Sequence, residues 1–236
     1  MFYKAGPAAI GLAALSTIAI STTASAQSVT GGELTIDAYS FRAGDNESTV
    51  NYSGALEYGI NRNFSVAGDL ALYDFTLLDD SIFNVTVHGI YHVNDQTSVG
   101  VLIGNDNLDG DDTTFYGLEG GFEANQLTVE GYFAFYDDND DSTVIGVSGG
   151  YQITDAISAI GTVGYGDIDN NDVTRISAGA EYDFQGGPSI YAEIGNVDTD
   201  DDNSVFIGLG AKVEFGAARG TTFDRRGISP TLLPFF

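Results

Sequence analysis

Apolar and polar residues alternate with a period of two along most of this chain, a pattern typical of β-strands with one apolar and one polar face. Phe83, Val85 and Val87, for example, share one face, and the residues between them are polar. Twelve such segments cover roughly 33–42, 48–60, 64–75, 82–93, 97–105, 113–124, 127–137, 143–153, 157–167, 173–184, 189–197 and 204–215. Each has about the ten residues that a tilted strand needs to cross a membrane.

The connections between these segments are of two kinds, and the two kinds alternate. Short connections rich in Asn, Asp and Gly, which tolerate the backbone of a tight turn, lie at 61–63, 94–96, 125–126, 154–156 and 185–188. Slightly longer, acidic connections include 109–112, 137–141 and 198–202. This alternation predicts an up-and-down antiparallel transmembrane β-barrel of about twelve strands, with ten or fourteen as alternatives.

An aromatic row marks the short-turn end of the repeat. Tyr58, Tyr91, Phe122, Tyr151 and Tyr182 follow one another every 29 to 33 residues, and Val213 takes the sixth place. In an outer-membrane barrel such a row forms the girdle at the lipid–water interface. The alternative is a soluble barrel or sandwich, which would bury the apolar face instead. An even number of strands places both chain ends on the short-turn, periplasmic rim.

The first residues predict a secretory signal peptide at 1–26. Lys4 gives a positive start, an apolar stretch runs from Ala8 to Ile20, and the small residues Ala24 and Ala26 form a cleavage site. After it, no apolar run reaches the roughly 18 to 20 residues of a transmembrane helix. We therefore expect the barrel at 27–215 and a further segment at 216–236, either a periplasmic tail or a plug.

Composition narrows the classes of function. The 34 acidic residues outnumber the 8 basic ones, and the net charge is −26. Such a chain is unsuited to nucleic acid, whose phosphates demand Lys and Arg. The absence of cysteine excludes disulfides.

The polar face of a membrane barrel lines its lumen. The ionisable residues predicted there are Asp37, Glu57, Asp69, His88, His92, Glu119, Glu123, Glu130, Arg175, Glu181, Asp183, Glu193, Lys212 and Glu214. If the lumen is a water-filled pore, this acidic wall favours cations. The same charges could instead pair with one another inside a closed barrel. The number of strands leaves both alternatives open, since the interior of an eight-stranded barrel is filled by side chains and that of a sixteen-stranded barrel is an aqueous channel. Small residues on this face, such as Gly146, Gly164 and Gly166, favour the pore.

The last predicted strand carries glycine, an apolar residue and a terminal aromatic at Gly210, Val213 and Phe215. In this the chain resembles Gram-negative outer-membrane β-barrels of the porin-like kind. The resemblance covers Gln27 to Phe215. It implies insertion by the barrel-assembly machinery, contact with outer-membrane lipid and lipopolysaccharide, and a fold that forms homo-oligomers in some members. The chain continues past Phe215, so Phe235 and Phe236 are an alternative place for the terminal signal.

The predicted function is a porin-like channel for passive diffusion of small hydrophilic solutes with a preference for cations. One alternative is a non-conducting structural or adhesive barrel with acidic surface loops, which would bridge to lipopolysaccharide through divalent cations. The second is a lipid-acting barrel enzyme that uses His88 or His92. These two histidines lie four residues apart on one strand, about 13 Å, which is too far to share a metal. We expect no enzyme activity, no cofactor and no specific metal site.

Overall fold

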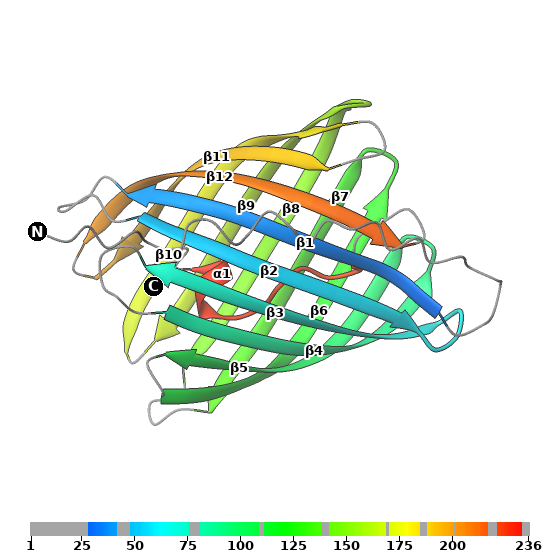
Figure 1. Ribbon diagram of the computed structural model, residues 1–236. Coiled ribbons are helices and arrows are strands. Elements are labelled where there is room, and N and C mark those ends of the chain that lie inside the picture. Colours follow the sequence, from blue (N-terminus) through cyan, green and yellow to red (C-terminus); the bar gives the residue numbers. More distant parts are fainter. Residues whose placement is uncertain are drawn as a thin grey trace, which may run out of the picture.

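The computed structural model describes residues 28–41, 48–75, 81–108, 111–137, 142–168, 170–184, 188–200, 202–216 and 221–232. Within them lie twelve strands and a short helix (Figure 1). The elements are β1 (Ser28–Phe41), β2 (Ser48–Gly59), β3 (Phe64–Phe75), β4 (Ser81–Asn94), β5 (Thr97–Leu108), β6 (Asp111–Ala124), β7 (Leu127–Asp137), β8 (Thr143–Thr154), β9 (Ile157–Ile168), β10 (Asn171–Asp183), β11 (Ser189–Thr199), β12 (Asn203–Gly216) and α1 (Ile228–Thr231). The predicted signal peptide lies outside the described residues, as do parts of the acidic loops (109–110, 138–141 and 201) and of the turn at 185–188.

Each strand pairs antiparallel with its neighbours in sequence, and β1 also pairs with β12, which closes the barrel. At the closure Leu34 lies opposite Val213. The predicted up-and-down barrel of twelve strands is therefore confirmed. The largest difference in bounds is at β1, which begins five residues before its predicted start, because Gly31 and Gly32 pair with both neighbours although their sequence shows little alternation.

The outer surface of the barrel is apolar and the inner surface is polar. Leu118 and Leu209 are 65% and 60% exposed on the outside, whereas Glu57 and His88 are 0% and 1% exposed inside. Water would disfavour so large an exposed apolar surface, and lipid would cover it. The soluble alternative required the apolar face to be buried, so it is wrong for this barrel. Among the described residues, no helix is long and apolar enough to cross a membrane.

The aromatic row lies on this outer surface beside the short turns. Tyr58, Tyr91, Phe122, Tyr151 and Tyr182 are all 41–52% exposed, and each is within three residues of the end of its strand. Two rings of the row pack against aromatic neighbours: Tyr91 lies 5.0 Å from Phe64, and Tyr182 lies 5.0 Å from Phe184, measured between ring centroids. This placement suits the predicted interfacial girdle.

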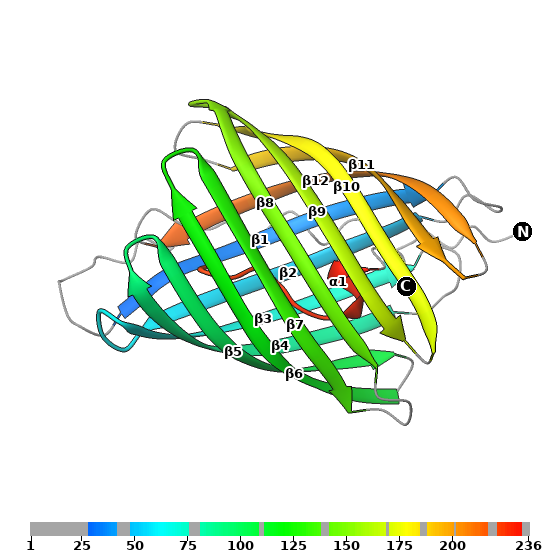
Figure 2. The ribbon, with the colours of Figure 1, turned by 180° about the vertical axis from the view of Figure 1, so that it is seen from behind.

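Residues 221–232, which we call the C-terminal strap, lie inside the barrel. Figures 1 and 2 show α1 and the segment before it enclosed by strands on both sides. The β12 strand ends at the short-turn rim, so the strap approaches the interior from that rim. Phe223 and Leu232, near its two ends, are 2% and 0% exposed. The interior is therefore occupied by a segment of the same chain.

A second part of the interior is filled by apolar side chains at the loop rim. The buried cluster there consists of Tyr39, Phe41, Leu102, Phe115, Tyr132, Ala134, Tyr136, Val144, Val173, Val197, Phe206 and Leu232. Phe115 stacks on Tyr136 with ring centroids 5.0 Å apart, and Phe206 lies 5.5 Å from Phe41. The prediction that small residues leave an open cross-section is wrong in this half of the barrel, because large neighbours occupy the space that the glycines leave.

Candidate lumenal site

The centre of the lumenal site is the strap residue Arg226. Its guanidinium lies 3.1 Å from Glu119 Oε2, and its two terminal nitrogens each lie 3.2 Å from an oxygen of Glu130. The fork of an arginine matches a carboxylate in this two-point geometry, which makes the contact strong and directional. Burial lowers the pKa of Arg226, but Glu130 and Glu119 more than compensate, so the net pKa lies above its ordinary value. Arg226 is therefore a fixed positive charge inside the barrel.

The wall residue Glu119 connects Arg226 to His88. The two ring nitrogens of His88 lie 2.8 Å from Glu119 Oε1 and 2.7 Å from Asp69 Oδ2. A neutral imidazole has a single N–H, whereas carboxylates only accept hydrogen bonds. The imidazole thus lies between two carboxylates, with one ring nitrogen within hydrogen-bond distance of each. The predicted lumen residues from β3, β4 and β6 meet here around one strap side chain.

The second strap arginine, Arg225, reaches the opposite wall. Its Nη2 lies 3.4 Å from Asp37 Oδ2 on β1. The same carboxylate accepts hydrogen bonds from Asn51 at 2.6 Å and from the Tyr191 hydroxyl at 3.0 Å. Two adjacent arginines thus connect the strap to strands on different sides of the barrel.

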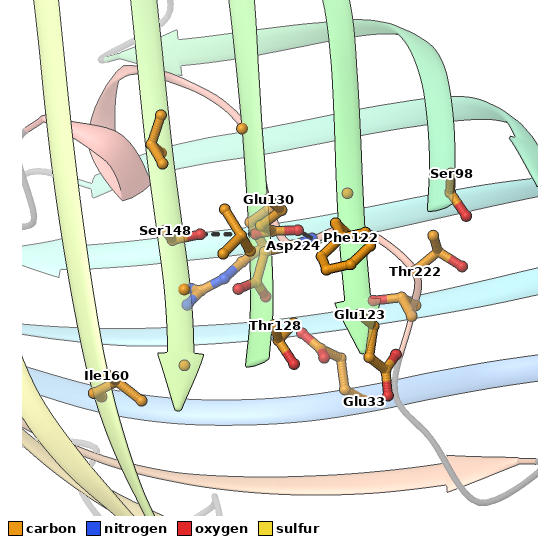
Figure 3. A pocket seen from close by; sticks show the side chains of 18 of the residues that line it. Glu33, Ser98, Phe122, Glu123, Thr128, Glu130, Ser148, Ile160, Thr222 and Asp224 are labelled. Carbon is orange, nitrogen blue, oxygen red and sulfur yellow. Dashed lines mark hydrogen bonds between the residues drawn. The ribbon is translucent and has the colours of Figure 1, made fainter. Parts of the chain in front are cut away.

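Backbone groups of the strap also bond to wall side chains. The amide of Thr222 donates to Glu57 at 2.7 Å, and the amide of Asp224 donates to Glu130 at 3.1 Å. Figure 3 shows Glu130 between Ser148 and Asp224, with a hydrogen bond to each. Further bonds join Ile228 N to Asp106, Asn84 to the carbonyl of Arg226, Arg175 to the carbonyl of Pro230, and Tyr132 to Thr231 and the carbonyl of Gly227.

Two further ion-pair groups lie on the wall. Arg175 pairs with Glu193 at 3.1 Å, its guanidinium carbon lies 5.1 Å from the Phe206 ring, and Glu193 accepts a hydrogen bond from the Tyr39 hydroxyl. Nearer the short-turn rim, Lys212 Nζ lies 2.8 Å from Glu214 and 3.7 Å from Glu181. Of the other predicted lumen residues, Asp183 is half-buried and Glu123 is exposed to the lumen.

His92 lies apart from this network, between two serines. Its Nε2 is 2.9 Å from Ser65 Oγ and its Nδ1 is 2.9 Å from Ser98 Oγ, while Glu57 lies 3.8 Å away. Ser65 comes from β3 and Ser98 from β5, the two strands that pair with β4 on either side. The two histidines share no partner in these contacts.

A cavity of about 960 Å³, which we call the lumenal chamber, lies beside the strap. Its lining runs from short-turn residues such as Asn94 and Asn125 to the strap, and includes Glu33, Glu123 and Glu130 (Figure 3). The chamber therefore combines a volume suited to small molecules with a wall rich in carboxylates.

No protein-family model matches this chain, and no curated protein matches it. Solved structures resemble it in fold. The NanC porin has a TM-score of 0.62 at 10% identity, over 76% of this chain and 98% of that one. The KdgM porin has 0.55 at 12% identity, over 77% and 99%, and an outer membrane channel from Pseudomonas putida F1 has 0.52 at 13% identity, over 79% and 95%. The chain has the fold of the porin-like outer-membrane β-barrels.

The predicted insertion residues Gly210, Val213 and Phe215 lie on β12, the last strand of this porin-like barrel. The Phe215 ring covers Gly32, where an added Cβ would lie 2.3 Å from the ring, and the Tyr191 ring covers Gly210 in the same way. Val213 is paired with Leu34 of β1. The three residues thus lie at the seam that closes the barrel. The alternative signal at Phe235 and Phe236 lies outside the described residues.

Two acidic residues on the inner face of the described strands were missing from the predicted set. Glu33 is 6% exposed and Asp106 is 8% exposed, both on the inner face. The position of Glu33 could have been predicted, because residues an even number apart on a strand share a face and Glu33 is four residues from the inward Asp37 on β1. Asp106 was missed because the predicted strand ended at residue 105, whereas β5 continues to Leu108.

Proposed function

We propose that this protein is an outer-membrane channel for passive diffusion of small hydrophilic solutes, with a preference for cations. The observation that carries the proposal is the lumenal chamber inside a closed barrel with an apolar outer surface. The porin-like fold supports a channel, and the girdle and short turns support a Gram-negative outer membrane. The short-turn rim, where β1 begins and β12 ends, would face the periplasm, whereas the C-terminal strap that follows β12 returns into the lumen. Lipid and lipopolysaccharide would surround the barrel, and the barrel-assembly machinery would insert it.

The cation preference follows from the sign of the wall. Carboxylates from several strands line the chamber, among them Glu33, Glu123, Glu181, Asp183 and Glu214. Acidic groups around a narrow aqueous path attract cations and repel anions. The KdgM porin has been solved in complex with disordered oligogalacturonate. A polyanion of that kind would be repelled by this wall, so we propose neutral or cationic solutes for this chain.

The reversal potential of the channel in a potassium chloride gradient tests the preference. We expect a value toward the potassium equilibrium potential, and we expect Glu123→Gln with Asp183→Asn to move it toward zero, because two wall charges are removed. The matched control is Asp155→Asn, which removes an acid from the same rim at an exposed turn position outside the chamber lining. A reversal potential toward the chloride value would contradict the cation preference.

A non-conducting structural barrel is the second candidate, and the packing of the interior favours it. The apolar cluster at the loop rim and the strap together fill much of the lumen. A barrel filled in this way can be a rigid surface scaffold, with acidic loops that contact lipopolysaccharide through divalent cations. Complete electrical silence of the wild type and of every strap variant described below would favour this function over the channel.

We expect no lipid hydrolysis, although His92 has hydroxyl partners. A serine nucleophile needs a base that is oriented by a third group. Ser98 or Ser65 could be the nucleophile and His92 the base, since both hydroxyls lie 2.9 Å from the ring, but the carboxylate of Glu57 lies 3.8 Å away, too far to orient the ring by a hydrogen bond. The folded protein in phospholipid vesicles should release fatty acid no faster than vesicles alone. Hydrolysis that is lost in His92→Ala and retained in His88→Ala would overturn this expectation.

A further inference from the structure

We propose that the C-terminal strap is a displaceable plug, which closes the lumen in the conformation described above and opens it by leaving its seat. This inference rests on the proposed function, because a plug regulates conduction only in a barrel that conducts. The sequence left a periplasmic tail and a plug as alternatives for this segment. The charges, shape and backbone of the strap all support the plug.

Charge complementarity is the first support. Arg225 and Arg226 bring two positive charges to Asp37, Glu119 and Glu130, which belong to β1, β6 and β7. Strands β1 and β7 lie on opposite sides of the closed strand order. The strap therefore bridges the lumen across its width and does not lie along a single wall.

Shape complementarity is the second support. At Gly166 an added Cβ would lie 2.3 Å from Leu232, and at Gly164 it would lie 2.7 Å from the carbonyl oxygen of Thr231. Gly100 and Gly121 stand in a similar relation to the Phe223 ring, at 3.0 and 3.1 Å. The wall thus has glycine at the positions against which the large side chains and the backbone of the strap pack. We call these four glycines the seat of the strap.

The backbone at Gly227 is the third support. Its φ of 137° belongs to a region that residues with a Cβ rarely adopt, and an added Cβ would lie 2.7 Å from Asn84 Nδ2. This glycine turns the chain between Arg226, which bonds to the wall, and α1, which packs at the loop rim. A larger residue at this position would displace the strap without changing its charge.

The strap is also held in a way that permits release. Its contacts with the wall are ion pairs, side-chain hydrogen bonds and packing, whereas the twelve strands are joined to one another in a closed ladder that does not include it. The strap can therefore leave without unpairing any strand. The lumenal chamber adjoins Asp224, Arg225 and Arg226, which gives the strap room to move toward the short-turn rim.

A reversible covalent lock tests the plug in the full chain. Gly164→Cys with Thr231→Cys places two thiols where an added Cβ at 164 is 3.0 Å from Thr231 Cγ2, a spacing that suits a disulfide. The natural chain has no cysteine, so this would be its sole disulfide. Single-channel currents would be recorded with the disulfide oxidised and again after reductant, with the two single-cysteine variants as controls. Loss of 2 Da on oxidation, seen by mass spectrometry, would show that the lock has formed.

We expect the oxidised lock to reduce the time spent open at least tenfold, and reductant to restore it, while neither single-cysteine variant responds to reductant. Because a Cβ at 164 crowds the carbonyl of Thr231, the reduced double variant and not the wild type is the baseline for this comparison. Gly227→Val, which unseats the strap without cysteines, should raise the time spent open. Equal conduction by oxidised and reduced forms would overturn the plug and leave the channel proposal intact. Failure of the pair to oxidise would place residue 231 elsewhere and overturn the plug as well. Silence of all forms, Gly227→Val included, would refute the channel proposal itself.

Discussion

Reversing both strap charges, with Arg225→Glu and Arg226→Glu, is expected to increase the open time of the channel by a factor of at least ten. Each change removes a buried partner of a carboxylate and replaces it with a like charge facing Asp37, Glu119 or Glu130. Removing one partner of a buried ion pair costs roughly 3–5 kcal/mol. A loss of that size would populate the displaced strap. Single-channel recording in a planar bilayer at fixed voltage measures the effect.

The control for this charge reversal is Arg62→Glu, which makes the same change at an exposed turn residue of the chamber lining that takes no part in the ion pairs of Arg225 and Arg226. It should leave the open time within about twofold of the wild type. Arg226→Lys keeps the charge but loses the two-point contact with Glu130, so an intermediate effect is expected. Folding of each variant is checked by its mobility in unheated detergent gels, where a closed barrel migrates differently from the unfolded chain. An unchanged open time in a folded double variant would refute the role of the arginines.

Replacing Leu118 by arginine is expected to destabilise the barrel by about 2–4 kcal/mol, which is the cost of a cationic side chain on the lipid face at the bilayer midplane. Leu118 is 65% exposed on the outer surface and lies near the middle of β6. A loss of this size lowers the folding equilibrium constant by roughly 30- to 1,000-fold. Folding into phospholipid vesicles across a series of urea concentrations measures it.

The matched control for Leu118→Arg is Gln126→Arg, which adds the same side chain at an exposed turn residue beyond the predicted girdle. Because the cost falls to about 0–1 kcal/mol near the interface, this variant should unfold almost as the wild type does. Equal stability of Leu118→Arg and Gln126→Arg would show that the outer surface does not face hydrocarbon. That result would contradict the membrane assignment.

The barrel was predictable because it depends on local patterns. A period of two marks each strand, and Asn, Asp and Gly mark each short turn, so β3 and β7 have the predicted bounds. Closure between β1 and β12 followed from an even number of strands of similar length. The inner and outer faces followed from the same period, which is why His88 and Leu118 lie on the predicted sides.

The pairing of interior charges was not predictable, since it depends on strand register and on side chains from distant segments. Asp69, His88 and Glu119 come together because β3, β4, β5 and β6 are consecutive neighbours in the sheet, and their register places these three inward side chains side by side on one part of the wall. Alternation could place these groups on one face, but it could not show that they contact one another. The partner of His92 at Ser65 was missed for the same reason.

The sequence by itself determined the twelve strands, the two rims, the apolar outside and the acidic inside, because each is encoded in residues close together along the chain. Tertiary structure alone decided what fills the lumen. Glycine at positions 164 and 166 is compatible with an open pore, and equally with a surface against which a large side chain from a distant segment of the chain packs. Leu232, nearly seventy residues away, occupies that seat. The free energy of such a contact depends on two segments meeting in space, and no local pattern records it.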